Sequence, residues 1–161
     1  MIRKILTLGA PILREKALPV RKFDANLKRL VNDMIETMKS ANGAGLAAPQ
    51  IGVSQRVIVV LKEDMEPLAL INPSIVQAEG MEEDEEGCLS IPNLYAIVPR
   101  PAYVKVTAFN PKGRAVSIEA EGIVARALCH EIDHLDGVLF IDKAYPDTFR
   151  WVKAEKAESK S

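Results

Sequence analysis

The sequence predicts an α+β fold, in which mainly antiparallel β-strands pack around a late central helix and a second helix lies near the amino terminus. Three observations support this prediction. An amphipathic helical pattern follows Asp24, short strand-like segments fill the middle of the chain, and a second helical pattern begins only after residue 120. Strands that follow one another closely pair antiparallel, and a late helix can then cover one face of their sheet.

Length and composition indicate a single globular domain. The chain has 161 residues, 48% of them hydrophobic and 27% charged, so we expect one domain over residues 1–161, with a frayed tail from about residue 150. The net charge of −1 gives no indication of DNA binding. No apolar run approaches the ~20 residues that span a bilayer. The first residues also lack the pattern of a signal peptide, and we expect a cytoplasmic protein without a disulfide.

The first helix is predicted to begin after Asp24, which is a suitable N-cap, and to end at the Asn42-Gly43 pair. Its apolar side chains are spaced by three and four residues, as on one face of a helix. They are Leu27, Leu30, Val31, Met34, Ile35 and Met38.

The middle of the chain is predicted to form strands. Residues 55–62 form an apolar run typical of a buried strand, and residues 68–72 and 74–78 form two more, separated by Pro73. Residues 103–109 alternate between apolar and polar side chains. A turn at Asn110-Pro111-Lys112-Gly113 then leads into residues 115–120, which predicts a hairpin.

The late helix carries the most informative motif, His130-Glu131-Ile132-Asp133-His134. Residues four apart lie one above the other on a helix, so the two imidazoles can bind one divalent metal ion. Glu131 can then act as a general base. These are the only two histidines in the chain. Gly137 suits the left-handed residue that often ends a helix.

A catalytic metal site usually has three protein ligands and one open position, and the third ligand distinguishes the possible functions. Glu155 or Glu158 would supply it in a zincin-like metallopeptidase. Cys88, in Glu86-Gly87-Cys88-Leu89-Ser90, would supply a thiolate instead. A non-catalytic domain with a structural metal would need a fourth ligand. Cys129 is the only good candidate, and it projects about 100° away from His130 on the helix.

A third segment, Gly43-Ala44-Gly45-Leu46-Ala47-Ala48-Pro49-Gln50, is rich in small residues. Such residues leave the backbone open to a ligand, and the Gln50 carboxamide can donate hydrogen bonds without adding charge. The segment lacks the lysine and hydroxyl of a phosphate-binding loop. By itself it could be a simple connection between a helix and a strand.

Taken in order, the three segments resemble the peptide deformylase family, which carries G-x-G-L-A-A-P-Q, E-G-C-L-S and H-E-x-D-H-L motifs. The resemblance extends from about residue 5 to about residue 145. It implies a metal-dependent amide hydrolase that removes the formyl group from the N-terminal formylmethionine of newly synthesised polypeptides and releases formate. The family frequently has glutamine where this chain has Cys129.

The resemblance also implies the roles of individual residues. Cys88, His130 and His134 would bind one divalent metal ion, with Fe²⁺ as the usual ion and Zn²⁺, Ni²⁺ or Co²⁺ as replacements. Glu131 would be the catalytic acid and base. Gln50 and the backbone N–H of Leu89 would donate to the substrate carbonyl oxygen. The resemblance also implies contacts with the methionine side chain and with the rest of the substrate peptide.

The methionine side chain of the substrate needs an apolar pocket. We expect its wall at Ile123 and Ala127, with Gly43 and Ala44 opposite. The rest of the peptide could bind as an extended strand beside Gly43–Gly45 and Ile91–Leu94, through backbone hydrogen bonds that tolerate any sequence.

We expect N-formylmethionyl nascent chains as partners, with transient ribosome contact but no DNA or membrane, and a monomeric protein. The basic residues that cluster in sequence are Arg14, Lys16, Arg21 and Lys22.

Several residues near these motifs are expected to be structural. Glu86 and Arg100 could form a buried pair behind Cys88, and Asp133 could pair with Arg126. Residues 82–86 are all acidic and are expected to form a solvated loop. Trp151 is expected to dock the tail on the body of the protein.

Overall fold

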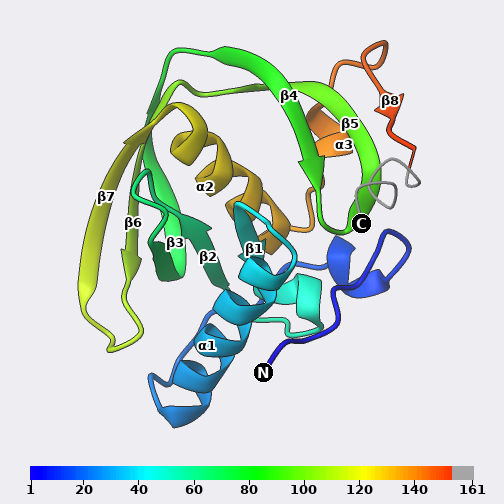
Figure 1. Cartoon of the computed structure of the whole chain (residues 1–161). Coiled ribbons are helices and arrows are strands. Elements are labelled where there is room, and N and C mark those ends of the chain that lie inside the picture. Colours follow the sequence, from blue (N-terminus) through cyan, green and yellow to red (C-terminus); the bar gives the residue numbers. More distant parts are fainter. Residues whose placement is uncertain (154–161) are drawn as a thin grey trace.

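The computed structural model describes residues 1–153 and has the predicted α+β architecture (Figure 1). The helical elements are η1 (Pro11–Arg14), α1 (Ala25–Ser40), η2 (Ala48–Ile51), α2 (Gly122–Leu135) and α3 (Phe140–Lys143). The strands are β1 (Gly45–Ala47), β2 (Val57–Leu61), β3 (Pro67–Glu79), β4 (Glu82–Cys88), β5 (Ile91–Arg100), β6 (Tyr103–Phe109), β7 (Ala115–Glu121) and β8 (Arg150–Trp151).

The strands form two sheets in which all neighbours are antiparallel. The larger sheet has the order β1-β2-β3-β6-β7, and the smaller has the order β4-β5-β8. The predicted hairpin is confirmed, because β6 pairs with β7 from Tyr103–Glu121 to Phe109–Ala115. Antiparallel pairing follows from the short connections between successive strands.

Strand β3 corrects one prediction. Residues 68–72 and 74–78 were expected to form two strands separated by Pro73, but they belong to one continuous strand. The register of the β3–β6 pair shifts between Ile71 and Ser74. A proline has no N–H to donate and is tolerated at such an irregularity. Pro73 therefore bends the strand without ending it.

The two longer helices cover opposite faces of the larger sheet (Figure 1). In β2, Ile58 packs in the same cluster as Leu128 of α2. Its neighbour Val57 packs with Met34 of α1. Successive side chains of a strand point to opposite faces, so an apolar strand can be buried on both sides. This arrangement makes α2 the central helix.

The predicted helix ends are confirmed. The Asp24 carboxylate accepts a hydrogen bond from Leu27 N at 3.1 Å and caps α1, and Asn42 has a left-handed φ of 56° after the helix. Gly137 follows α2 with a φ of 73°. A Cβ at Gly137 would also lie 2.5 Å from the carbonyl oxygen of Arg14. Glycine is required there for both reasons.

The smaller sheet corrects the prediction of a loop at residues 82–86. These residues form most of β4, which pairs with β5 from Glu82–Arg100 to Glu86–Ala96. The side chains of residues 82–85 are exposed, as expected, whereas Glu86 is buried. Acidic residues have a low intrinsic strand propensity, so pairing with β5 decides their conformation.

The tail also differs from the prediction, because Arg150 and Trp151 form β8 instead of a frayed segment. They pair with Tyr95 and Leu94 of β5. The Trp151 side chain is 72% exposed, so the backbone docks this segment and the indole does not. Glu155 and Glu158 lie outside the described residues.

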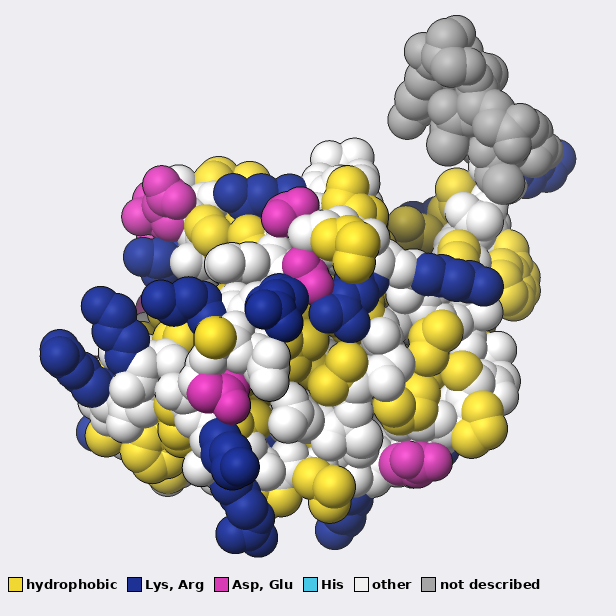
Figure 2. Space-filling model, turned by 90° about the horizontal axis from the view of Figure 1, so that it is seen from below, with side chains coloured by type: hydrophobic (Ala, Val, Ile, Leu, Met, Phe, Trp, Pro, Cys, Tyr) yellow, Lys and Arg dark blue, Asp and Glu magenta, His cyan; other side chains and the backbone are white. Residues whose placement is uncertain are grey.

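The face of the molecule seen from below carries Lys and Arg side chains that are spread among hydrophobic and acidic ones (Figure 2). The helices of the described residues are too short or too polar to cross a membrane.

Candidate active site

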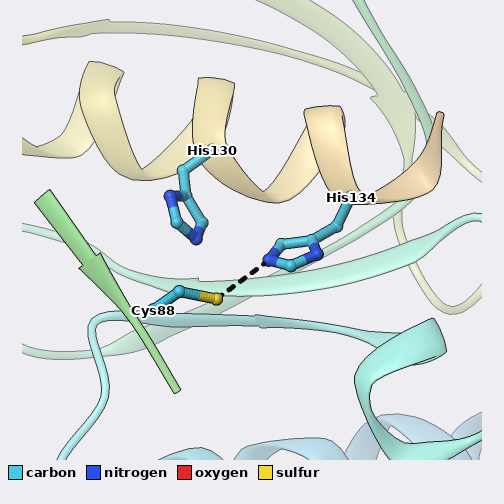
Figure 3. A group of neighbouring side chains, drawn as sticks. All are labelled: Cys88, His130 and His134. Atoms are coloured by element: carbon cyan, nitrogen blue, oxygen red, sulfur yellow. Dashed lines mark hydrogen bonds between the residues drawn. The ribbon is translucent and has the colours of Figure 1, made fainter. Parts of the chain in front are cut away.

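Cys88, His130 and His134 converge on one point between β4 and α2 (Figure 3). Their ligand atoms all lie within 4.8 Å of one another, and Cys88 Sγ is 3.4 Å from His134 Nε2. Ligands of a tetrahedral site with bonds of about 2.0–2.3 Å are separated by roughly 3.3–3.8 Å. Among the described residues, this is the only such group of metal-ligating side chains. The donor set fits one divalent metal ion.

The carboxylate of Glu86 lies behind the three converging side chains and accepts four hydrogen bonds. Oε1 accepts from His130 Nδ1 at 2.8 Å and from Arg100 Nη2 at 2.9 Å. Oε2 accepts from Arg100 Nε at 2.8 Å and from Arg126 Nη1 at 2.7 Å. With Nδ1 of His130 donating, its Nε2 lone pair is left for a metal ion. The predicted Glu86–Arg100 pair is therefore present and buried.

The charge of Glu86 is maintained despite its burial. Burial by itself would raise the pKa of this carboxyl, but the hydrogen bonds from Arg100 and His130 lower the pKa to about 2. The same contacts raise the pKa of Arg100, against the effect of its burial. Glu86 is therefore ionised throughout the physiological range and keeps the His130 ring oriented.

Asp133 and Arg126 do not form the ion pair that the sequence allowed. Asp133 instead accepts from Arg100 Nη1 at 2.6 Å and from Lys143 Nζ. Arg126 donates to Glu86 and to the carbonyl oxygens of Val98 and Glu82. Arg126 thus joins α2 to the smaller sheet. Sequence spacing could not reveal this role, because its partners lie on strands 28 to 44 positions away.

Glu131 is 4% exposed and lies beside the two histidines on α2. Its Oε1 finds no hydrogen-bond partner among the described residues. Burial raises the pKa of Glu131 to about 7. A carboxyl group with a pKa near neutrality can both accept and return a proton at physiological pH.

His134 is buried and electrically neutral. Its burial, together with the neighbouring His130 and Arg100, lowers the pKa of this imidazole to about 3. A neutral imidazole is the form that binds a metal ion. Its Nδ1 is buried and finds no hydrogen-bond partner in residues 1–153, whereas Nε2 faces Cys88 (Figure 3).

Gln50 lies opposite the helix, with its carboxamide held in one orientation. Oε1 accepts from the backbone N–H of Ala47 at 2.9 Å, so Nε2 must point the other way. Nε2 donates to Ser90 Oγ at 3.0 Å and lies 3.7 Å from Cys88 Sγ. Ser90 is a second residue whose contact the sequence did not reveal, although it lies in the same segment as Cys88.

A cavity of about 440 Å³ opens beside this group. The residues expected around the methionine side chain line it together with Gly45; they are Gly43, Ala44, Gly45, Ile123 and Ala127. Of the expected peptide path at Ile91–Leu94, the first three residues line the cavity and Leu94 does not. Gln50, Cys88, Leu89, His130 and Glu131 line the same cavity. Ile123 is 74% exposed.

Cys129 does not belong to the site. Its side chain is buried in the core cluster between α2 and the larger sheet. Burial raises the pKa of this thiol, which keeps it protonated and unsuited to metal binding. The projection of Cys129 away from the histidines, expected from the helical geometry, is thus confirmed.

Gly45 lets β1 pass close to Glu131, and an alanine there is expected to impair catalysis. A Cβ at this position would lie 2.6 Å from Glu131 Oε2 and 2.9 Å from its Cγ. The carboxylate would have to move, and displacements of about 1 Å can cost roughly 100-fold in rate. We expect kcat for formate release from a formylmethionyl peptide to fall by about 10- to 100-fold in Gly45→Ala, with normal metal content.

Gly43→Ala is a suitable comparison for this variant. A Cβ at Gly43 would meet Leu89 Cδ1 at 2.7 Å, which is the end of a flexible side chain and can rotate away. We expect a smaller loss of kcat in Gly43→Ala. Full kcat in Gly45→Ala would show that the Glu131 carboxylate does not depend on this close approach.

The sequence as a whole matches known proteins. The model of the polypeptide deformylase family matches residues 2–149. A peptide deformylase of Desulfitobacterium hafniense is 51% identical over 143 residues, covering 89% of this chain and 95% of that protein. One of Caldicellulosiruptor bescii is 49% identical over 160 residues, covering 99% of this chain and 93% of that protein.

The fold matches as well. The crystal structure of peptide deformylase from Thermotoga maritima superposes with a TM-score of 0.87 at 45% identity and covers 91% of this chain and 99% of that chain. The structure from Synechococcus elongatus in complex with actinonin gives a TM-score of 0.85 at 43% identity, with 89% and 79% covered. This chain belongs to the polypeptide deformylase family, whose members remove the formyl group from the N-terminal methionine of polypeptides.

Proposed function

We propose that Cys88, His130 and His134 bind the catalytic metal ion of this deformylase, that Glu131 transfers the proton, and that Gln50 and the Leu89 N–H bind the formyl oxygen. The observation that supports this assignment best is the convergence of the three ligand atoms within 4.8 Å, beside a buried Glu131. The zincin-like alternative needs Glu155 or Glu158 as third ligand. The convergence of Cys88 with both histidines favours the thiolate instead.

We propose Fe²⁺ as the native ion, on the resemblance to the family, with Zn²⁺, Ni²⁺ or Co²⁺ as replacements. Two imidazoles and a thiolate suit any of these borderline ions. When bound, such an ion lowers the pKa of water and polarises a carbonyl oxygen. An Fe²⁺ site with a thiolate ligand is expected to be sensitive to oxygen.

Glu131 accepts the proton of the attacking water in this scheme and later delivers it to the leaving amine. A raised pKa suits both steps, because the carboxyl exchanges its proton near neutral pH. Its unpartnered Oε1 leaves one carboxylate oxygen available for this transfer. In this reaction the C–N bond of the formamide breaks, water supplies one of the two oxygens of formate, and the amine gains a proton.

Gln50 is expected to stabilise the negative charge that develops on the formyl oxygen. Its Nε2 faces Cys88 because Oε1 is occupied by the Ala47 N–H. Loss of one such donor typically costs about 10²–10³-fold in rate. We therefore expect Gln50→Ala to lower kcat by that factor while metal content is unchanged, as measured by formate release and metal analysis.

The Ser90→Ala variant is the control for Gln50→Ala. This substitution removes the Oγ that accepts from Gln50 Nε2 but leaves the Gln50 donor in place. Its loss of kcat should be much smaller. Equal losses in Gln50→Ala and Ser90→Ala would assign Gln50 a structural role only.

The methionine side chain of the substrate is proposed to enter the 440 Å³ cavity beside Ile123 and Ala127, with Gly43 and Ala44 opposite. The peptide would continue beside Gly45, which lies on the edge strand β1 of the larger sheet. An edge strand offers unpaired backbone groups to an extended peptide. The complex of the Synechococcus elongatus relative with actinonin suggests that actinonin would bind here too.

We further propose that the protein is a cytoplasmic monomer that contacts ribosomes transiently, where its nascent substrates appear. Of the basic residues that cluster in sequence, Arg14 is paired with Asp142. Its charge is therefore partly neutralised, and the remaining contact would depend on Lys16, Arg21 and Lys22.

The assignment is tested by formate release from a formyl-Met peptide, with protein purified anaerobically and loaded with Fe²⁺. Release should be rapid, and Zn²⁺-loaded protein should be slower. Cleavage of an unformylated peptide, without formate release, would favour the metallopeptidase. Bound metal with no reaction on either substrate would favour a structural site.

A further inference from the structure

We propose that Arg150 is a positioning residue, which holds Tyr95 and Glu85 in the outer wall of the cavity and thereby favours binding of the peptide residues that follow methionine. This inference rests on the proposed path of the peptide through the cavity. It concerns a strand that lies just past residues 2–149, the part of the chain that the family model matches.

Strand β8 adds to the free edge of β5. Arg150 pairs with Tyr95 and Trp151 with Leu94, and Val152 N donates to the carbonyl oxygen of Asn93 at 2.7 Å. These backbone bonds place the Arg150 side chain directly beside the Tyr95 ring. The short strand therefore has a defined register on the smaller sheet.

The Arg150 side chain reaches from β8 across β5 to β4. Its Nε and Nη2 donate to the two carboxylate oxygens of Glu85 at 2.5 and 2.7 Å. Its guanidinium carbon lies 5.3 Å from the centroid of the Tyr95 ring. A planar guanidinium can bind a carboxylate with two donors while it contacts an aromatic ring. One side chain thus joins all three strands of the sheet.

Tyr95 links the Arg150 side chain to the segment that contains Cys88. A Cβ at Gly87 would lie 2.5 Å from Tyr95 Cε1, so the edge of the ring rests on the glycine that precedes Cys88. Glu85, Gly87, Asn93 and Tyr95 all line the cavity, whereas Arg150 is not among its lining residues. Arg150 must therefore act through Tyr95 and Glu85.

These residues are placed to contact the peptide and not the formyl group. Glu85 and Tyr95 lie on β4 and β5 before and after the Cys88 turn, and Glu131 and Gln50 contact neither of them through a hydrogen bond in the described structure. The phenol of Tyr95 and the amide of Asn93 offer donors and acceptors to a peptide backbone. The wall they form would bind a substrate only when the peptide extends past methionine.

The test compares two substrates of different length, formyl-Met amide and a formyl-Met-Ala-Ser peptide, with metal-loaded protein. Cation–π contacts and exposed ion pairs are individually weak, so loss of both is expected to weaken binding by roughly 3- to 30-fold. In Arg150→Ala we expect KM for the longer peptide to rise within this range. The values of kcat for both substrates, and KM for the amide, should be unchanged.

Three further variants complete the test. Arg150→Lys keeps the charge but loses the two-donor geometry, and it should restore part of the lost affinity. Arg14→Ala breaks a comparable exposed pair with Asp142 at residues that do not line the cavity, and it should change neither KM. Glu85→Gln removes the negative charge of the Arg150–Glu85 pair. It should raise KM for the longer peptide only, and by less than Arg150→Ala does.

Binding measured without turnover separates this inference from the proposed function. Calorimetry measures the Kd of formyl-Met-Ala-Ser for metal-loaded Glu131→Ala protein. The Kd should be higher for the double variant that also carries Arg150→Ala. That difference would support the inference even if formate release had failed. Equal rises in KM for both substrates, or no change in KM and Kd, would overturn it while leaving the deformylase function intact.

Discussion

Substitution of Glu131 by alanine is expected to reduce formate release by roughly 10²–10⁴-fold, with the metal ion still bound. This is the typical range for loss of a positioned general acid or base. The carboxylate lies beside the ligand group but is not part of it, so metal content should remain close to one ion per chain. The measurements are kcat with a formyl-Met peptide and metal analysis of the same sample.

Glu82→Ala is the matched control, because Glu82 is an exposed carboxylate on the neighbouring β4. Its kcat should equal that of the unaltered protein. Undiminished kcat in Glu131→Ala would exclude the proposed proton transfer. Loss of metal in that variant would instead assign Glu131 a part in holding the site together.

The Glu131 carboxyl group also predicts how kcat/KM depends on pH. Glu131 must be ionised to accept a proton from water, so kcat/KM should fall as the pH drops below the pKa of the carboxyl. Burial raises this pKa to about 7, and the charge of a bound divalent ion lowers it again. The acidic limb should therefore lie at or below pH 7 in metal-loaded protein and should be absent from the residual activity of Glu131→Gln.

Substitution of Cys88 by alanine is expected to remove the metal ion and, with it, all measurable formate release. Cys88 is the charged ligand of the proposed set, and its Sγ lies 3.4 Å from His134 Nε2. Loss of a residue that only supports a ligand costs about 10–100-fold in metal affinity, so loss of the ligand itself should cost more. Metal affinity measured by competition with a chelator checks this directly.

Cys129→Ala is the control for Cys88→Ala, because it removes the other thiol at a position inside the core. It should retain the metal ion and full kcat. The expected cost is only in thermal stability, since a small buried side chain is shortened. Retention of metal in Cys88→Ala, together with its loss on truncation of the tail, would revive Glu155 or Glu158 as the third ligand.

Local patterns in the sequence predicted the parts of the site that lie on one element. His130, Glu131 and His134 share α2 because four residues make about one turn, and this spacing needs no knowledge of the rest of the chain. The cap at Asp24 and the β6–β7 hairpin are equally local. Family motifs extended the prediction to Cys88 and Gln50, but their relation to the helix was an implication of the resemblance and not of the spacing.

The predictions that depended on partners from distant strands were less successful. Arg126, on the same helix, was only one possible partner for Asp133, which instead binds Arg100 from β5. The acidic run at residues 82–86 predicts a solvated loop because charged runs usually face water, yet it pairs with β5 as strand β4. Arg150 was predicted to lie in a frayed tail, whereas its backbone pairs with Tyr95 of β5.

The sequence alone thus predicted the fold class, the candidate ligands and the helix that carries two of them. Only the tertiary structure decided that one carboxylate, Glu86, is shared by His130, Arg100 and Arg126. Hydrogen bonds and ion pairs of this kind depend on side-chain positions to within a few tenths of an ångström. Elements far apart in the chain acquire such positions only when the sheets pack on α2, and no local pattern encodes them.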